Sequence, residues 1–184
     1  MNKKWWIVIA IVVFFLGYWV VSYNHFVSLD QGIQGQWAQV ETQYQRRLDL
    51  IPNLVSSVQG AMKQEKEVFE AIATARTQYG SAKSVSEKVI ASNQVESALS
   101  RLLVVMENYP QLKSIDTVGT LMAQLEGTEN RISVERGRFN DNVKSYNTSV
   151  QMFPSSLIAK LSGFGEKPYF EAAKGAEVAP TVSL

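Results

Sequence analysis

A run of 17 residues without a charged side chain, Trp5 to Val21, constrains this chain more than any other feature. Coiled as an α-helix, the run would span about 25 Å, close to the ~30 Å hydrocarbon core of a bilayer. Both of its ends are rich in amphipathic aromatic rings, which favour membrane–water interfaces. The sequence therefore predicts a transmembrane anchor over residues 5–23. The predicted membrane-interface residues are Trp5, Trp6, Tyr18, Trp19 and Tyr23.

A cleaved signal peptide is the alternative, because a basic start followed by an apolar run is typical of both. The run is longer than the apolar part of a typical signal peptide and ends in aromatic residues, which favours an uncleaved anchor. Lys3 and Lys4 precede the run, and the next basic residue after it is Arg46. The positive-inside rule then predicts that residues 1–4 are cytoplasmic and that the remaining domain lies outside the cytoplasm.

Composition removes most kinds of chemistry. The chain has no Cys and a single His, His25, which excludes disulfides, thiol nucleophiles, Cys-based zinc sites and any site needing two His ligands. Its 18 basic and 17 acidic residues give a net charge of +1, which argues against nucleic-acid binding. No phosphate-binding Gly-rich loop or nucleophile elbow is present. We therefore expect no cofactor, no metal and no catalytic activity.

Beyond the anchor, apolar residues recur at spacings of three and four, which predicts helices throughout. The first helix continues from the anchor to Pro52, because a residue before Pro is pushed out of the helical region. A second helix is expected from Pro52 to Gly80. The third begins at a capping box formed by Ser84 and Glu87, in which each side chain satisfies an unpaired backbone N–H.

The fourth helix is expected over about residues 116–152, with an apolar face that ends at Val150 and Phe153. No alternating β-type pattern competes with these helices. The fold prediction is all-α, with an N-terminal transmembrane helix followed by an antiparallel up-and-down four-helix bundle over residues 24–153. Residues 154–184 are expected to form a short amphipathic segment and a flexible C-terminal tail.

Two polar clusters are candidate sites in such a bundle. The first is a partner surface at the membrane-distal tip, because Arg and aromatic residues are enriched at binding hot spots. A structural role of its cations, complementing the dipole at a helix C-terminus, is the alternative. The residues of this candidate surface are Arg46, Arg47, Asn53 and Tyr109.

The second candidate is a buried polar layer around Glu129, which the spacing of its helix directs inward. A buried carboxylate needs a cationic partner, and Arg131, Arg101 and Arg136 are candidates. The alternative is a carboxylate-lined metal or proton site, although a di-metal bundle requires two Glu-x-x-His motifs that this chain lacks. The residues assigned to the layer are Glu41, Glu129, Arg131 and Arg136.

Several sequence blocks together resemble one family. They include QWAQVETQYQRRLDLIPNLV (36–55), EAIATAR (70–76), ENYPQLK (107–113), GTENRISVERGRFN (127–140) and APTV (179–182). In order and spacing these blocks resemble the LemA family of bacterial membrane proteins. The resemblance covers nearly the whole chain. It implies a single-pass anchor and a four-helix bundle, and it does not imply a catalytic activity.

We therefore expect a membrane-anchored helical scaffold or protein-interaction module of the bacterial cell envelope, crossing the inner membrane once. Its expected partners are the membrane and unidentified envelope proteins, and a homo-oligomer built by extending the anchor as a coiled coil is compatible with the pattern. The alternative is a membrane-surface or lipid-acting envelope-stress factor that works through the membrane-proximal tail. A third option is an enzyme that uses the Glu129 layer.

Overall fold

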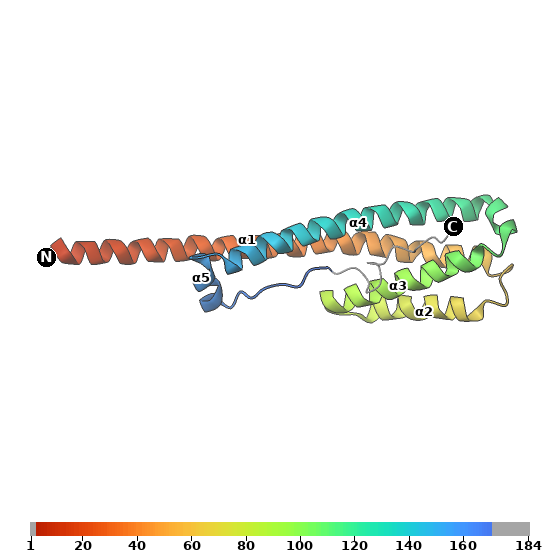
Figure 1. Ribbon diagram of the computed structural model, residues 1–184, viewed down its shortest axis with the longest axis horizontal. Coiled ribbons are helices and arrows are strands. Elements are labelled where there is room, and N and C mark those ends of the chain that lie inside the picture. The colour runs from red at the N-terminus through yellow and green to blue at the C-terminus, as the bar shows by residue number, and fades with distance from the viewer. Residues whose placement is uncertain (1–2, 171–184) are drawn as a thin grey trace, which may run out of the picture. The chain divides into compact units, whose positions relative to one another are not determined.

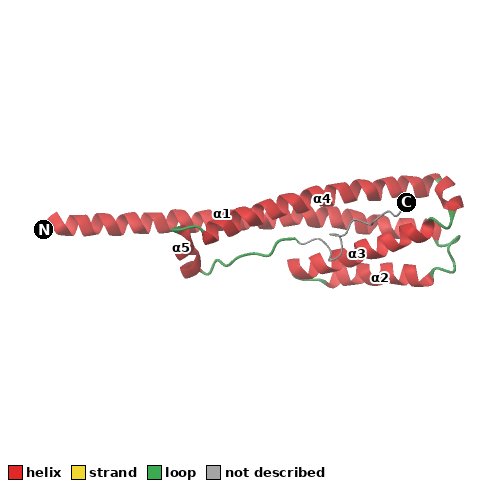
Figure 2. Ribbon diagram, viewed as in Figure 1, coloured by secondary structure: helices red, strands yellow, loops and turns green. Residues whose placement is uncertain are grey.

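The structure, a computed structural model, describes residues 3–170, and these form only helices and loops (Figure 2). The all-α prediction is therefore confirmed for the described part of the chain. The N-terminal dipeptide and the predicted flexible tail from residue 171 onward lie outside the described residues. In chain order the elements are α1 (Lys3–Val58), α2 (Lys66–Ser81), α3 (Val85–Met106), the 3₁₀ helix η1 (Pro110–Ser114), α4 (Asp116–Gln151) and α5 (Ser155–Ser162) (Figure 1).

Helix α1 continues through Pro52 to Val58, so the predicted helix end at Pro52 is wrong. A Pro inside a helix removes one backbone hydrogen bond and costs roughly 3 kcal/mol. Ile51, Leu54 and Val58 lie on the same helical face and are almost completely buried. Burying each of these side chains contributes about 1.5–3 kcal/mol, which offsets the cost of Pro52. Residues 59–65 then form the turn before α2.

The predicted capping box at the start of α3 is confirmed. The backbone N–H of Glu87 donates to Ser84 Oγ over 3.2 Å, and the Glu87 carboxylate accepts from the backbone N–H groups of Ser84 and Lys83. These backbone hydrogen bonds stabilise the ionised carboxylate and lower the pKa of Glu87 below its ordinary value. The cap thus fixes where the chain re-enters a helix after α2.

The described chain divides into two compact units, and α1 and α4 contribute residues to both. The first unit comprises residues 3–38 and 136–169. Its core is aromatic: the Phe26 ring stacks on Phe164 with centroids 5.1 Å apart, and Trp37 meets Phe139 edge-on at 5.7 Å. Asn147 fixes the segment after α5, because its side chain both donates to the carbonyl of Lys167 and accepts from the Lys167 N–H.

The second unit comprises residues 39–135 together with Phe170. Helices α2 and α3 lie side by side and are joined by a short turn (Figure 1). Each contributes an apolar face to the core, as do the parts of α1 and α4 that belong to this unit. Among the core side chains are Val40, Tyr44, Leu48, Val68, Ile72, Val95, Leu99, Leu102, Val118 and Ile132.

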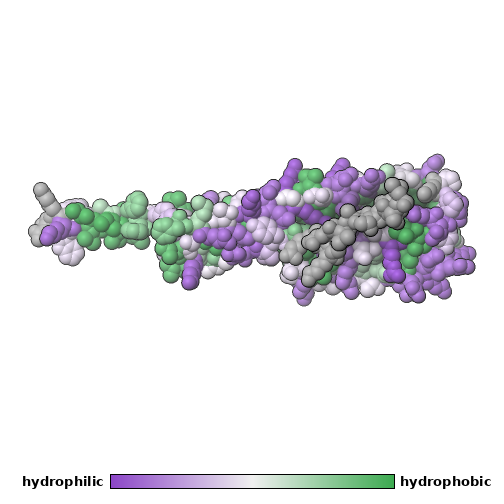
Figure 3. Space-filling model, viewed as in Figure 1, coloured by the Kyte–Doolittle hydropathy of each residue, from purple (hydrophilic) through white to green (hydrophobic). Residues whose placement is uncertain are grey.

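The apolar run forms the N-terminal part of α1 and is exposed along most of its length, which Figure 3 shows as hydrophobic surface. Among the described residues, this one helix is long and apolar enough to cross a membrane. The first buried residue that follows on α1 is Ser22, and Phe26 comes one turn later. Packing against the rest of the first unit therefore begins where the run ends.

The lowered pKa of Glu87 predicts a pH-dependent stability. A lowered folded-state pKa stabilises the protein above the ordinary value of 4.5, and this contribution is lost as the pH falls through the folded-state pKa. We expect Glu87→Gln to lower the melting temperature of the full chain. The difference from wild type should not change with pH near neutrality, and it should shrink below pH 4.5. Thermal unfolding followed by circular dichroism checks this, with Glu70→Gln on the exposed face of α2 as control. A pH-independent difference would contradict the cap's electrostatic role.

Candidate functional site

Arg47 occupies an inward position of α1 in the second unit. The inward side chains Val40, Tyr44, Ile51 and Leu54 follow spacings of four and three, and Arg47 fills the position between Tyr44 and Ile51. Only 4% of its surface is exposed. A guanidinium buried to this degree is stable only when paired and hydrogen-bonded, so its partners define the site.

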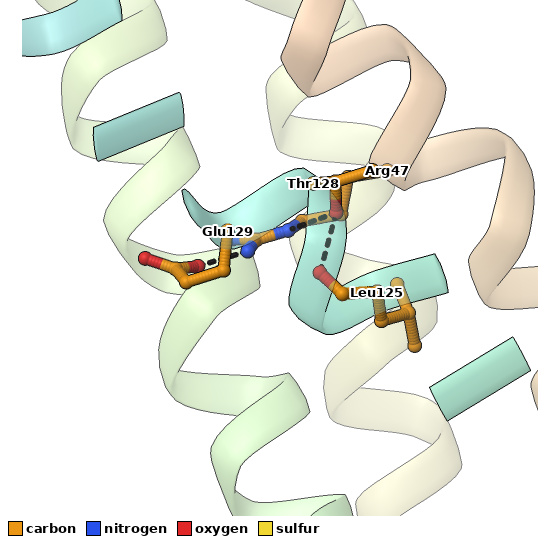
Figure 4. A network of polar contacts seen from close by, with 4 residues as sticks. All are labelled: Arg47, Leu125, Thr128 and Glu129. Atoms are coloured by element: carbon orange, nitrogen blue, oxygen red, sulfur yellow. Dashed lines mark hydrogen bonds and ion pairs between the residues drawn. The ribbon is translucent and has the colours of Figure 1, made fainter. Parts of the chain in front are cut away.

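The partners of Arg47 come from α4 (Figure 4). Its Nη2 donates to the carboxylate of Glu129, and its Nε donates to Thr128 Oγ1 over 3.4 Å. The Thr128 hydroxyl in turn donates to the carbonyl of Leu125 over 2.7 Å. Thr128 is buried, whereas the Glu129 side chain is 42% exposed. The buried cation is thus neutralised by a carboxylate that still reaches water.

A groove of about 580 Å³ lies beside this ion pair, between α3 and α4. Its walls are mainly apolar, with Leu99 and Leu103 from α3 and Met122 and Leu125 from α4. Arg47 and Glu129 form part of its lining, together with Glu96 and Glu126. A concave apolar surface next to a few fixed polar groups is the usual form of a binding site in proteins.

A second ion pair joins α1 to the first turn of α3. The Lys88 ammonium donates to the carboxylate of Glu41 and lies 5.8 Å from the centre of the Tyr79 ring. Tyr79 itself is buried against Tyr44. Its burial, and to a smaller degree Tyr44, raises the pKa of Tyr79 to about 12, so the phenol keeps its proton at neutral pH.

The residues of the predicted tip surface have different environments. Arg46 and Asn53 are exposed on α1. Tyr109 is half-buried, and its hydroxyl donates to Glu65 over 3.1 Å, which connects the α1–α2 turn to the segment before η1 and raises the pKa of Tyr109. The prediction of an exposed Arg47 is wrong, because this residue belongs to the inward stripe of α1.

The predicted polar layer is only partly assembled. Glu129 pairs with Arg47, which was not among the expected partners Arg131, Arg101 and Arg136. Arg131 is exposed, and Arg136 belongs to the first unit. Glu41, also assigned to the layer, pairs with Lys88. Within residues 3–170, no three His, Asp or Glu side chains converge closely enough to hold a metal ion.

Sequence reasoning missed Arg47, Thr128 and Lys88 as members of these pairs. For Arg47 a signal existed, because the four–three spacing of the apolar residues of α1 already includes position 47. The sequence analysis instead assigned Arg47, together with Arg46, to the candidate tip surface. For Lys88 no sequence signal identifies Glu41 as the partner, since the two residues lie 47 positions apart.

The predicted interface aromatics frame the apolar run. Trp5 and Trp6 are exposed at its start, with Trp19 at its end, and Tyr18 is half-buried. Tyr23 packs against Phe164 of the first unit, with ring centroids 5.5 Å apart. The run thus ends at a contact with the folded part of the chain.

Comparison with known proteins decides the family. The sequence model of the LemA family matches residues 36–184. The chain belongs to the LemA family. The match begins after the apolar run and includes Arg47, Glu129 and the residues of the groove. The site described above therefore lies in the part of the chain that defines a LemA protein.

Curated relatives support the same assignment. Magnetosome proteins MamQ 1 and MamQ 2 of Paramagnetospirillum magneticum are each 27% identical to this LemA protein over 186 residues, covering 87% of this chain and 68% of the relative. Magnetosome protein MamQ of Magnetospirillum gryphiswaldense is 26% identical over 177 residues, covering 82% and 65%.

The ion pair predicts an asymmetric response to mutation. Glu129→Ala leaves the buried Arg47 charge without a partner, and we expect a loss of about 3 kcal/mol in unfolding free energy. Arg47→Met leaves a carboxylate that water can reach, and we expect a change within about 1 kcal/mol. The double variant is expected to regain most of the stability lost in Glu129→Ala. Urea unfolding of the full chain in detergent measures all three.

Arg131→Ala is the matched control, because Arg131 is an exposed Arg two residues from Glu129. Its effect is expected to stay within about 0.5 kcal/mol. If Arg47→Met and Glu129→Ala lowered the unfolding free energy equally, the expected asymmetry between a buried Arg47 and a water-accessible Glu129 would be wrong.

Proposed function

We propose that this LemA protein is a membrane-anchored, non-catalytic helical module that binds another protein at the bacterial inner membrane. The observation that carries the proposal is the continuity of α1. One uninterrupted helix bears the exposed apolar run and also supplies core residues and Arg47 to the second unit. The site around Arg47 and the proposed membrane anchor therefore belong to one and the same helix.

The proposed anchor is supported by the free-energy cost of leaving the apolar run exposed to water. The large apolar side chains between Trp5 and Val21, except Tyr18, are 38–71% exposed, and water disfavours contiguous apolar surface of this size. A bilayer removes that cost, and a helix satisfies its own backbone hydrogen bonds there. Lys3 and Lys4 favour a cytoplasmic N-terminus, with the helical domain on the opposite side of the inner membrane.

For the second unit we propose an antiparallel up-and-down four-helix bundle. Each of the three other helices contacts α1 through a specific pair: Tyr79 of α2 packs on Tyr44, Lys88 of α3 pairs with Glu41, and Glu129 of α4 pairs with Arg47. The connections between these helices are short. Short connections favour antiparallel neighbours.

The partner surface is proposed to be the α3–α4 groove, and the exposed residues Arg46 and Asn53 of α1 are a separate candidate surface. The charge of Arg47 is already neutralised by Glu129, and the exposed Glu126 lies on the margin of the groove. This favours a partner segment that places an apolar side chain in the groove and a basic one at its edge. Self-association through a second copy is the competing outcome.

A second candidate function is a membrane-surface or lipid-acting envelope factor that works through the segment after α4. It is favoured by apolar side chains that remain exposed around α5, among them Leu157 and Leu161. We retain it as the alternative.

The orientation can be tested cleanly because the chain has no native Cys. In spheroplasts, a membrane-impermeant maleimide is expected to label Ser56→Cys on the exposed side of α1, and to label Asn2→Cys only after lysis. The measurement is the labelled fraction on a gel. Labelling of the two positions in the reverse order would invert the proposed topology, and labelling of both before lysis would exclude a membrane span between them.

Partner binding can be tested by photo-cross-linking in cells. A photoreactive residue at Leu103 in the groove, or at Asn53 on the tip, is expected to capture one heterologous envelope protein. Glu126→Lys should reduce capture from Leu103 several-fold, because it reverses a charge at the groove margin. Lys63→Glu is the matched control, a charge reversal at an exposed position away from the groove. Capture of this chain alone would indicate a self-assembling scaffold.

A further inference from the structure

Four large apolar side chains are exposed where α4 ends and α5 begins. Met152 and Leu157 are 58% and 56% exposed, and Phe153 and Leu161 are 79% and 72% exposed. The last two values exceed the exposure of every large apolar residue in the run, of which Phe14 is highest at 71%. We name these four residues the corner patch. Phe153 was expected on the buried face of the fourth helix, and its exposure corrects that expectation.

Two members of the patch, Leu157 and Leu161, form a second apolar face of α5, distinct from the buried face of this helix. Ile158 and Ala159 are buried and hold α5 in place. Leu157 and Leu161 lie one helical turn apart, so they share a different face. Within the described residues this second face has no protein covering it. An eight-residue helix that exposes two Leu side chains in water carries a cost without a compensating contact.

Contacts within the first unit connect α5 to the end of the apolar run. The backbone N–H of Phe164 donates to the carbonyl of Ala159 over 2.9 Å, which closes the C-terminal end of α5. The Phe164 ring then packs on Phe26 and on Tyr23, the last residue of the predicted anchor. In Figure 3 the hydrophobic surface of the run continues onto the region that α5 occupies in Figure 1.

The charge of α5 itself also favours a membrane surface. Helix α5 has the sequence SSLIAKLS, with no carboxylate and with the exposed Lys160 between Leu157 and Leu161. Lys167 nearby is engaged in an ion pair with Asp30 and lies over the Tyr146 ring. Lys167 is therefore already paired, whereas Lys160 of α5 is exposed and can contact an anionic headgroup.

We propose that the corner patch inserts into the headgroup and acyl boundary of the bilayer, beside the transmembrane part of α1. The inference rests on the proposed membrane span, because the patch is continuous with that apolar surface. Amphipathic helices in this position bury their apolar face about 5–10 Å deep. Phe153, Leu157 and Leu161 supply the inserted side chains, and Lys160 faces a lipid phosphate. The protein then contacts the membrane at two places instead of one.

The test uses the full chain in vesicles of phosphatidylcholine and phosphatidylglycerol, with one environment-sensitive fluorophore attached to a single introduced Cys. The positions are Leu161→Cys in the patch, Leu16→Cys in the run, and Val104→Cys on the exposed side of α3, where the side chain is 64% exposed. Two quenchers are compared: a nitroxide on the lipid and iodide in the water. We expect strong nitroxide quenching and weak iodide quenching at Leu161 and Leu16, with the opposite pattern at Val104.

A second substitution makes the test specific to the patch. Leu157→Ser should raise iodide quenching at Leu161 several-fold, because it removes one of the inserted side chains. Val134→Ser on α4, an apolar-to-Ser change at an exposed position outside the patch and the groove, should leave the quenching at Leu161 unchanged.

Each other outcome overturns the proposal. If Leu16 is quenched by the lipid nitroxide but Leu161 behaves like Val104, the span is correct and the corner patch is exposed to water. If neither Leu16 nor Leu161 is quenched by the nitroxide, the membrane span fails as well. If Leu161 is protected from both quenchers and the protection is lost on dilution into more lipid, a second copy of the chain covers the patch.

Discussion

One helix has to satisfy two different surroundings, and the rest of the structure depends on how α1 does so. Its N-terminal part is apolar on every side, which suits lipid, and its C-terminal part has one apolar face, which suits a protein core. The change occurs at Ser22 and Phe26, the first positions where a side chain of α1 is buried by other parts of the chain. Because no breaker separates the two parts, the helix continues through the change.

The same helix continues through Pro52 for a related reason. A Pro is a local penalty of fixed size, whereas the burial of Ile51, Leu54 and Val58 is a tertiary gain that depends on a continuous helical face. Ending the helix at Pro52 would move Leu54 and Val58 off that face. The tertiary gain therefore decides where α1 ends.

Arg47 gives the core of the second unit a preferred register. The inward stripe of α1 would otherwise consist of similar apolar side chains at spacings of four and three, and such a stripe packs almost equally well after a shift of one heptad. A buried guanidinium that requires Thr128 and Glu129 at one height on α4 removes that freedom. An apolar residue at position 47 would fill the same volume without this selectivity. The exposed side of Glu129 keeps the cost of the pair low.

The comparison of sequence with structure separates local rules from tertiary ones. The capping box at Ser84 and Glu87 and the limits of α4 were predictable, because they depend on hydrogen bonds and periodicity within a few residues. The course of α1 through Pro52 and the pairing of Glu41 with Lys88 were not, because they depend on distant segments. Arg47 lies between these cases, since its position in the apolar spacing of α1 was predictable from the sequence but its partners Thr128 and Glu129 were not.

The corner patch follows from the same distinction and extends the role of the membrane. Periodicity placed Phe153 on the apolar face of the fourth helix, just past the expected helix end at about residue 152. The helix ends at Gln151, and the chain turns into α5 instead. The apolar side chains at this turn therefore need a different apolar environment. A single transmembrane helix is free to rotate about its axis, since lipid surrounds it equally on all sides. Insertion of Phe153, Leu157 and Leu161 at the interface would select one rotation, because the corner is joined to α1 through Phe164, Phe26 and Tyr23. The bilayer would then determine the rotation of α1 about its own axis as well as the depth at which α1 lies in the membrane.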